Sequence, residues 1–157
     1  MAILRSEDAE NPSSLELNAL STEDIQGQSW QRFTLTLKTG TYELKLGRFP
    51  SDSTETFSTI SDCLFCRNPQ DEVAELCKRL EALIENDKQQ LLFEPSEPSF
   101  EISISRTRQN EAKVEVWLDS GNATTGFYSW DAAGIRFHTL QEHLIAFLKE
   151  IKQEFAC

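Results

Sequence analysis

The stretch FEISISRTRQNEAKVEVWL, residues 100–118, decides the fold class. Apolar and polar residues alternate in its first and last parts, and a polar run at residues 107–111 separates these parts. A period of two places alternate side chains on opposite faces of a β-strand. The stretch therefore predicts two antiparallel strands that share one buried face. That face is formed by Phe100, Ile102, Ile104, Val114, Val116 and Leu118.

The same alternation predicts more strands on both sides of this stretch. Upstream, apolar and polar residues alternate over residues 33–37, and after a turn at Thr39-Gly40 the alternation resumes in residues 42–46. Two such runs around a glycine turn are typical of a β-hairpin. Shorter strands are expected at residues 60–66, 124–130 and 135–137.

Two segments have the apolar spacing of amphipathic helices. The first spans residues 71–84 and follows Asn68 and Pro69, which suit a helix start. The second follows TLQE (residues 139–142), which fits the S/T-x-x-E capping box. Because each helix is apolar on one side only, each should cover a sheet face. The predicted fold class is α+β, with antiparallel β-sheet meanders and two amphipathic α-helices packed on the sheet.

The composition is that of one acidic globular domain. Of 157 residues, 26 are Asp or Glu and 15 are Lys or Arg, which gives a formal net charge of −11. We expect a single domain over residues 29–157, preceded by an acidic, loosely ordered arm at residues 1–28. So acidic a surface repels phosphate, which argues against direct nucleic-acid binding. No run resembles a signal peptide or a membrane span, so a cytoplasmic protein without a membrane partner is expected.

The sequence contains few of the residue patterns that catalytic sites require. The sequence contains no phosphate-binding glycine motif, no HExxH motif and no EF-hand loop, so neither an active site nor a cofactor is predicted. Cys63 and Cys66 have the C-x-x-C spacing that can hold a metal ion or form a redox pair. A structural zinc site needs four ligands and the sequence offers no second pair, which favours simple packing of these cysteines. A metal or redox protein that uses Cys63 and Cys66 is the alternative.

Two kinds of side chain could form a protein-binding surface. Trp117 is out of phase with Val116 and Leu118, so it should face away from the core. There it is either covered by a helix, which is the expectation, or partly exposed as a binding anchor. Glu142 and Glu150 belong to the carboxylates around the last helix, which form either a solvated face or a docking surface for a basic partner.

Several features follow one another in a recognisable order over residues 30–155. Ser29-Trp30 precedes the first strands, the helix at residues 71–84 follows, and FEPSEP (residues 93–98) leads into the next strand. The order is completed by VEVW (residues 114–117), IRF (residues 135–137) and a closing helix with Leu144, Phe147 and Leu148. In this order of elements the chain resembles the WapI family of bacterial immunity proteins.

The resemblance implies a small cytoplasmic protein that binds and neutralises a cognate toxin, often a nuclease domain, and has no catalytic activity of its own. A nuclease that grips phosphate is basic at its site, and an acidic partner can steer to that site and occlude it. The main alternative is an α+β interaction module with some other protein partner. An acidic mimic of DNA is a further possibility.

Overall fold

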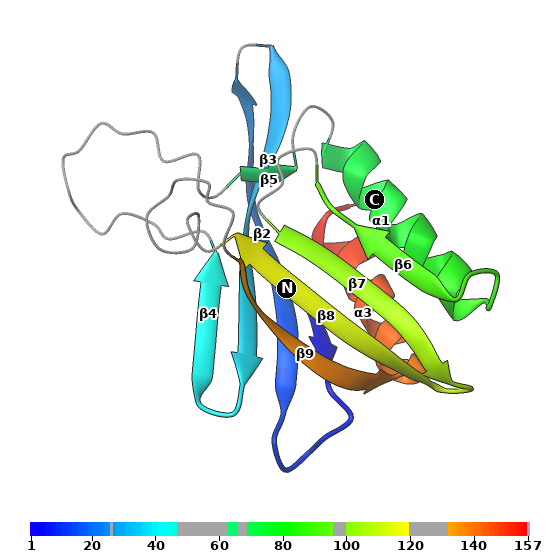
Figure 1. The fold of residues 1–157 in the computed structure, drawn as a ribbon. Helices are drawn as coiled ribbons and strands as arrows, with labels where there is room; N and C mark the ends of the chain where they lie inside the picture. Colours follow the sequence, from blue (N-terminus) through cyan, green and yellow to red (C-terminus); the bar gives the residue numbers. More distant parts are fainter. Residues whose placement is uncertain (26, 47–62, 66–68, 96–99, 120–131, 157) are drawn as a thin grey trace.

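The computed structural model of the chain describes residues 1–25, 27–46, 63–65, 69–95, 100–119 and 132–156 (Figure 1). Over these residues the chain forms two antiparallel β-sheets and two α-helices, which confirms the α+β class. Neither of the helices in the described ranges is long and apolar enough to cross a lipid bilayer.

The first sheet is built from the N-terminal part of the chain. Its strands are β1 (Ala2–Arg5), β2 (Ser13–Ile25), β3 (Gln28–Thr39) and β4 (Tyr42–Leu46), paired in that order, with the short β5 (Cys63–Phe65) on β3. The register aligns Leu4, Leu15, Leu37 and Leu44 in one apolar row across the four main strands. The predicted hairpin is confirmed. Its Gly40 has a φ of +55°, a left-handed conformation that glycine adopts readily.

The second sheet contains the stretch at residues 100–118. Its strands are β6 (Gln90–Phe93), β7 (Phe100–Arg108), β8 (Glu111–Asp119) and β9 (Ala132–Leu140), paired in chain order. The six side chains predicted to form its buried face are all 3% exposed or less. Strand β9 is longer than the expected residues 135–137, and the short β6 was not predicted.

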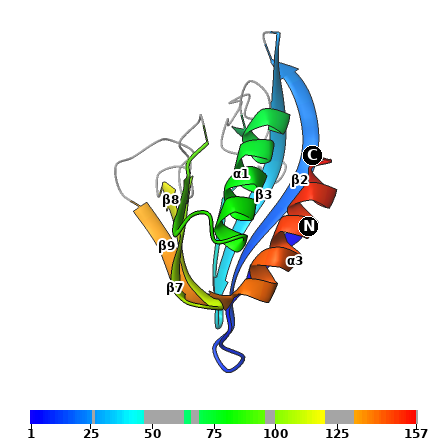
Figure 2. The same cartoon turned by 90° about the vertical axis from the view of Figure 1, so that its right-hand side faces the viewer.

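The two helices, α1 (Pro69–Ile84) and α3 (Gln141–Glu154), lie side by side (Figure 2), with α3 next to β1 of the first sheet and α1 next to β6 of the second. Their apolar faces join side chains from both sheets in one cluster of buried residues. Phe33 of β3 connects these parts, because its ring contacts Phe100 of β7 and Phe155 at the end of α3. The ring centroids are 5.9 and 6.2 Å apart, both in edge-to-face geometry.

The structure contradicts the expectation of a loosely ordered arm over residues 1–28. Strands β1 and β2 occupy most of this segment, and Ala2, Leu4, Leu15 and Leu17 are fully buried. Polar residues alternate with the buried side chains of β2 because they lie on its other, partly exposed face, and they make the segment look unstructured by composition. Pairing of β2 with β3, whose Phe33, Leu35 and Leu37 are fully buried, supplies the order that the composition of the segment does not indicate.

The predicted capping box at residues 139–142 is also wrong. The N-cap of α3 is Leu140, and no side chain caps the helix there. Thr139 is still part of β9, and its buried hydroxyl donates a hydrogen bond of 2.6 Å to the carbonyl oxygen of Arg5. In a capping box this hydroxyl would accept from a backbone N–H of the helix, whereas here it donates to a distant strand end.

Some predictions lie outside the described residues. These are the helix cap at Asn68, the strand at residues 124–130, and the part of the strand at residues 60–66 that lies beyond β5.

Candidate functional site

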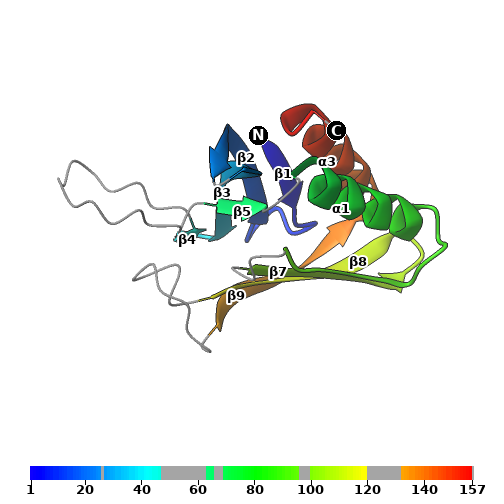
Figure 3. The same ribbon diagram turned by 90° about the horizontal axis from the view of Figure 1, so that it is seen from above.

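The helices pack on one face of the β6–β9 sheet and leave its other face open (Figure 3). Alternate side chains of each strand point to opposite faces, so the neighbours of the buried residues lie on this open side. The register arranges them in three rows across the sheet. The middle row is Leu92, Ser103, Glu115 and Arg136, flanked by a row of Glu101, Trp117 and Gly134 and a row of Gln90, Ser105, Lys113 and His138. We call these residues the outer face.

Trp117 is the large aromatic side chain of the outer face, and it is 37% exposed. It lies directly opposite Gly134 of β9. A Cβ atom on Gly134 would lie 2.8 Å from Trp117 Cε3 and 2.0 Å from the Val116 carbonyl oxygen, so only glycine fits under the indole ring. Gly134 was not among the predicted site residues, although an isolated glycine inside a strand indicates such a close approach.

Glu115 organises the charges next to Trp117. Its carboxylate oxygens lie 2.7 Å from Lys113 Nζ and 2.7 Å from Arg136 Nε. The hydrogen bond from Lys113, together with that from Arg136, lowers the pKa of Glu115 below its usual range, although partial burial acts in the opposite direction. The carboxylate therefore stays ionised at neutral pH and holds both cations in place on the sheet.

A comparison with protein families identifies the chain. The sequence model described as the Immunity protein WapI-like family matches residues 65–156, which is more than half of the 157 residues. The chain belongs to the WapI-like immunity protein family. The predicted resemblance is thus confirmed, although the match starts at Phe65 rather than near Trp30. Comparisons with curated proteins and with solved structures found no match.

The segment that matches the WapI-like family contains α1, α3 and all four strands β6–β9. Every residue of the outer face therefore belongs to it, whereas strands β1–β4 lie outside. The surface that carries the exposed Trp117 therefore lies entirely within the segment that matches the family.

The three predicted surface residues have different surroundings. Trp117 is exposed, and the expectation that a helix covers it is wrong, because both helices pack on the opposite face. Glu142, in the first turn of α3, has a side chain that is 78% exposed. Glu150 is instead part of the fold, since its carboxylate accepts a hydrogen bond of 2.7 Å from the backbone N–H of Ile3.

A group of exposed carboxylates borders the outer face at the start of α3. The loop between β1 and β2 carries Glu7, Asp8 and Glu10, all exposed, and the backbone N–H of Glu7 donates to the carbonyl oxygen of His138 at 2.9 Å. This contact places the loop beside β9 and near Glu142. We call Glu7, Asp8, Glu10 and Glu142 the acidic end.

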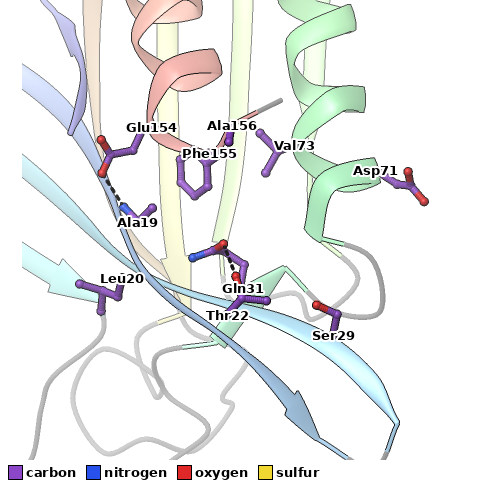
Figure 4. Close-up of a pocket in the computed structure, with 10 residues that line it drawn as sticks. All are labelled: Ala19, Leu20, Thr22, Ser29, Gln31, Asp71, Val73, Glu154, Phe155 and Ala156. Carbon is purple, nitrogen blue, oxygen red and sulfur yellow. Dashed lines mark hydrogen bonds between the residues drawn. The ribbon is translucent and has the colours of Figure 1, made fainter.

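A cavity of about 480 Å³ lies where β2, β3 and the ends of both helices meet (Figure 4). Its polar wall groups are largely engaged: Glu154 accepts from the N–H of Ala19 at 2.9 Å, and Thr22 donates to Gln31 at 3.2 Å. Phe155 and Val73 supply apolar wall, and the part of the lining that the structure describes contains no His or Cys. The lining offers no nucleophile paired with a base, so this cavity carries no argument for catalysis.

The cysteines can be placed only in part. Cys63 begins β5, and Cys66 lies outside the described residues, so the metal or redox alternative remains a prediction. Cys77 is buried on the apolar face of α1. Among the described residues, no three His, Cys, Asp or Glu side chains are grouped closely enough to hold a metal ion.

Proposed function

We propose that the chain neutralises a cognate toxin protein by docking it on the outer face of the β6–β9 sheet. The observation that carries the proposal is the family match, which includes every residue of the outer face. An inhibitor that covers a surface of its target needs no reactive group of its own. The proposed function is therefore binding and occlusion, without an enzymatic step.

Trp117 is the proposed anchor of the interface. Tryptophan is enriched among the residues that contribute most to binding, because it buries a large area with few rotatable bonds. Here the indole ring is already positioned over Gly134 in the free protein. Such preorganisation lowers the entropy that binding must offset.

The surroundings of Trp117 suit a protein partner better than a small ligand. Leu92, 50% exposed, adds apolar surface on the same face. Next to Trp117 on the same face of β8, Glu115 holds Lys113 and Arg136 through two ion pairs, so polar groups are available to hydrogen-bond around the apolar contacts. Apolar anchors within an ordered polar surround are the usual arrangement of a specific interface.

The charge of the chain favours a basic toxin. A formal net charge of −11 attracts a cationic surface at long range and raises the association rate. The acidic end, beside the outer face, is suited to meet such a surface. A nuclease fits this description, because its substrate site must be positive to bind phosphate.

The test is the affinity for the toxin domain encoded beside this gene, measured by calorimetry, together with rescue of growth when both are co-expressed. We expect Trp117→Ala to weaken binding by about 30-fold or more, the effect of losing a central anchor. Tyr42→Ala is the matched control, because Tyr42 is 59% exposed but lies in β4, outside the family segment.

The control should bind and protect as the unaltered protein does. Circular dichroism establishes that both variants are folded. Equal losses for both variants, or a loss for Tyr42→Ala alone, would place the toxin elsewhere on the molecule. Absence of any binding or protection by the unaltered protein would reject the toxin-inhibitor function itself.

A further inference from the structure

Strand β6 is an edge of the second sheet. It pairs with β7 on one side, and among the described strands none pairs with its other side. The carbonyl oxygen of Gln89, just before β6, accepts from the N–H of Arg106 at 3.0 Å and so faces β7. Backbone groups alternate direction along a strand, so those of Gln90 and Leu92 face away from β7. The side chain of Arg79 on α1 donates to the Leu92 carbonyl, in agreement with this direction.

A groove of about 420 Å³ follows this edge between β6 and α1. Three cationic side chains line it: Lys78 and Arg79 on α1, and Lys88 just before β6. Among the described residues that line it, the one carboxylate is that of Glu75, which is paired with Arg79 at 2.8 Å. In a chain with a net charge of −11, this groove is a local excess of positive charge.

We propose that the groove between α1 and β6 binds an extended acidic segment of a partner protein, which adds to the sheet as a strand beside β6. The outward N–H and C=O groups of Gln90 and the N–H of Leu92 are placed to pair with the backbone of such a segment. Lys78 and Lys88 would attract its carboxylates. Leu92, half exposed beside the groove, would contact its apolar side chains.

This groove adjoins the outer face at Gln90 and Leu92, but it selects the opposite charge from the proposed toxin contact at Trp117. A basic surface would be repelled by the net positive charge of the groove, whereas an acidic segment would be repelled by most of the remaining surface. The groove would therefore align an acidic segment with one particular strand edge. The simpler role of the lysines is to protect an exposed edge from unwanted strand pairing, and the experiment separates the two roles.

The probe is a fluorescein-labelled, end-blocked peptide of alternating Glu and Val, titrated with the full chain at about 0.15 M salt. We expect saturable binding that Lys78→Glu with Lys88→Glu weakens about tenfold or more. The matched control is Lys45→Glu with Lys149→Glu, which changes the net charge equally at exposed sites on β4 and α3. This control should bind nearly as the unaltered chain does.

Two further peptides test the strand pairing. A peptide of alternating Glu and Pro keeps the charge but loses every second N–H, and its prolines fix φ at about −65°, which opposes pairing as an extended strand. A peptide of alternating Lys and Val reverses the charge. We expect both to bind at least tenfold more weakly than the Glu-Val peptide, and the Glu-Val peptide to slow hydrogen exchange at the Gln90 and Leu92 amides. No binding of the Glu-Val peptide, equal losses in the two double variants, or equal binding of the Glu-Pro peptide would each overturn the proposal.

Discussion

The two sheets differ in how far the helices cover their edges and faces. On one side of the first sheet, α3 supplies carboxylates to the backbone, with Glu150 on Ile3 of β1 and Glu154 on Ala19 of β2. At the β6 edge of the second sheet, α1 supplies one guanidinium, that of Arg79, and an open groove remains. The first sheet is thus bound to a helix through its edge, whereas the second keeps an edge and a face available. We infer that the first sheet supports the fold and the second sheet binds partners.

The contact of Phe33 with Phe100 is the strongest test of whether the sheets depend on each other. Phe33 is fully buried and also contacts Phe155, so Phe33→Ala removes an aromatic ring from the junction of both sheets and α3. We expect a loss of about 3–5 kcal/mol of unfolding free energy, measured by urea denaturation. A loss below about 1 kcal/mol would indicate that the two sheets are stabilised separately. Tyr42→Ala is the exposed aromatic control.

Gly134→Ala tests the arrangement of the outer face. The added Cβ collides with the Val116 carbonyl oxygen and with the indole ring, so strand β9 or Trp117 must shift. We expect a destabilisation of about 2 kcal/mol together with weaker toxin binding. Ser105→Ala, on the same face, should change stability by less than about 0.5 kcal/mol. Unchanged stability and binding in Gly134→Ala would show that the position of the indole ring does not matter.

Glu150→Ala tests the edge of the first sheet. Without this carboxylate the N–H of Ile3 loses its acceptor, and we expect a loss of about 1.5 kcal/mol in unfolding free energy. Faster hydrogen exchange at Ile3 should accompany it. Glu10→Ala removes an exposed loop carboxylate of equal charge and should have little effect. Equal effects of the two substitutions would mean that net charge, rather than the edge contact, explains the result.

The smallest expected effect concerns the pH dependence contributed by Glu115. Its pKa is lowered in the folded protein by Lys113 and Arg136, so the unfolded chain binds this proton more readily. The stabilisation is therefore present above the ordinary glutamate pKa of about 4.3 and is lost as the pH falls through the lower, folded-state value. In urea unfolding at several acidic pH values, Glu115→Gln should reduce the slope of stability against pH. An unchanged slope would contradict a contribution from these ion pairs.

Much of the second sheet could be predicted because its signals are local. The alternation in residues 100–118 and the helical spacing of residues 71–84 each need only neighbouring residues. The outer position of Trp117 followed from the same alternation. Its exposure did not, because a period of two separates the faces of a strand without saying which face a helix will cover.

The amino-acid sequence by itself determined the fold class, the buried face of the second sheet, the two amphipathic helices and the acidic net charge. The tertiary structure decided which carboxylates stay exposed. Glu142 does, whereas the carboxylate of Glu150 accepts a hydrogen bond from the backbone N–H of a residue 147 positions away. It also gave order to β1 and β2, because β1 pairs with β2 and β2 pairs with β3. The physical reason is the same in both cases. Contacts between distant segments satisfy backbone hydrogen bonds and bury apolar side chains, and no local pattern records which distant segment will be the partner.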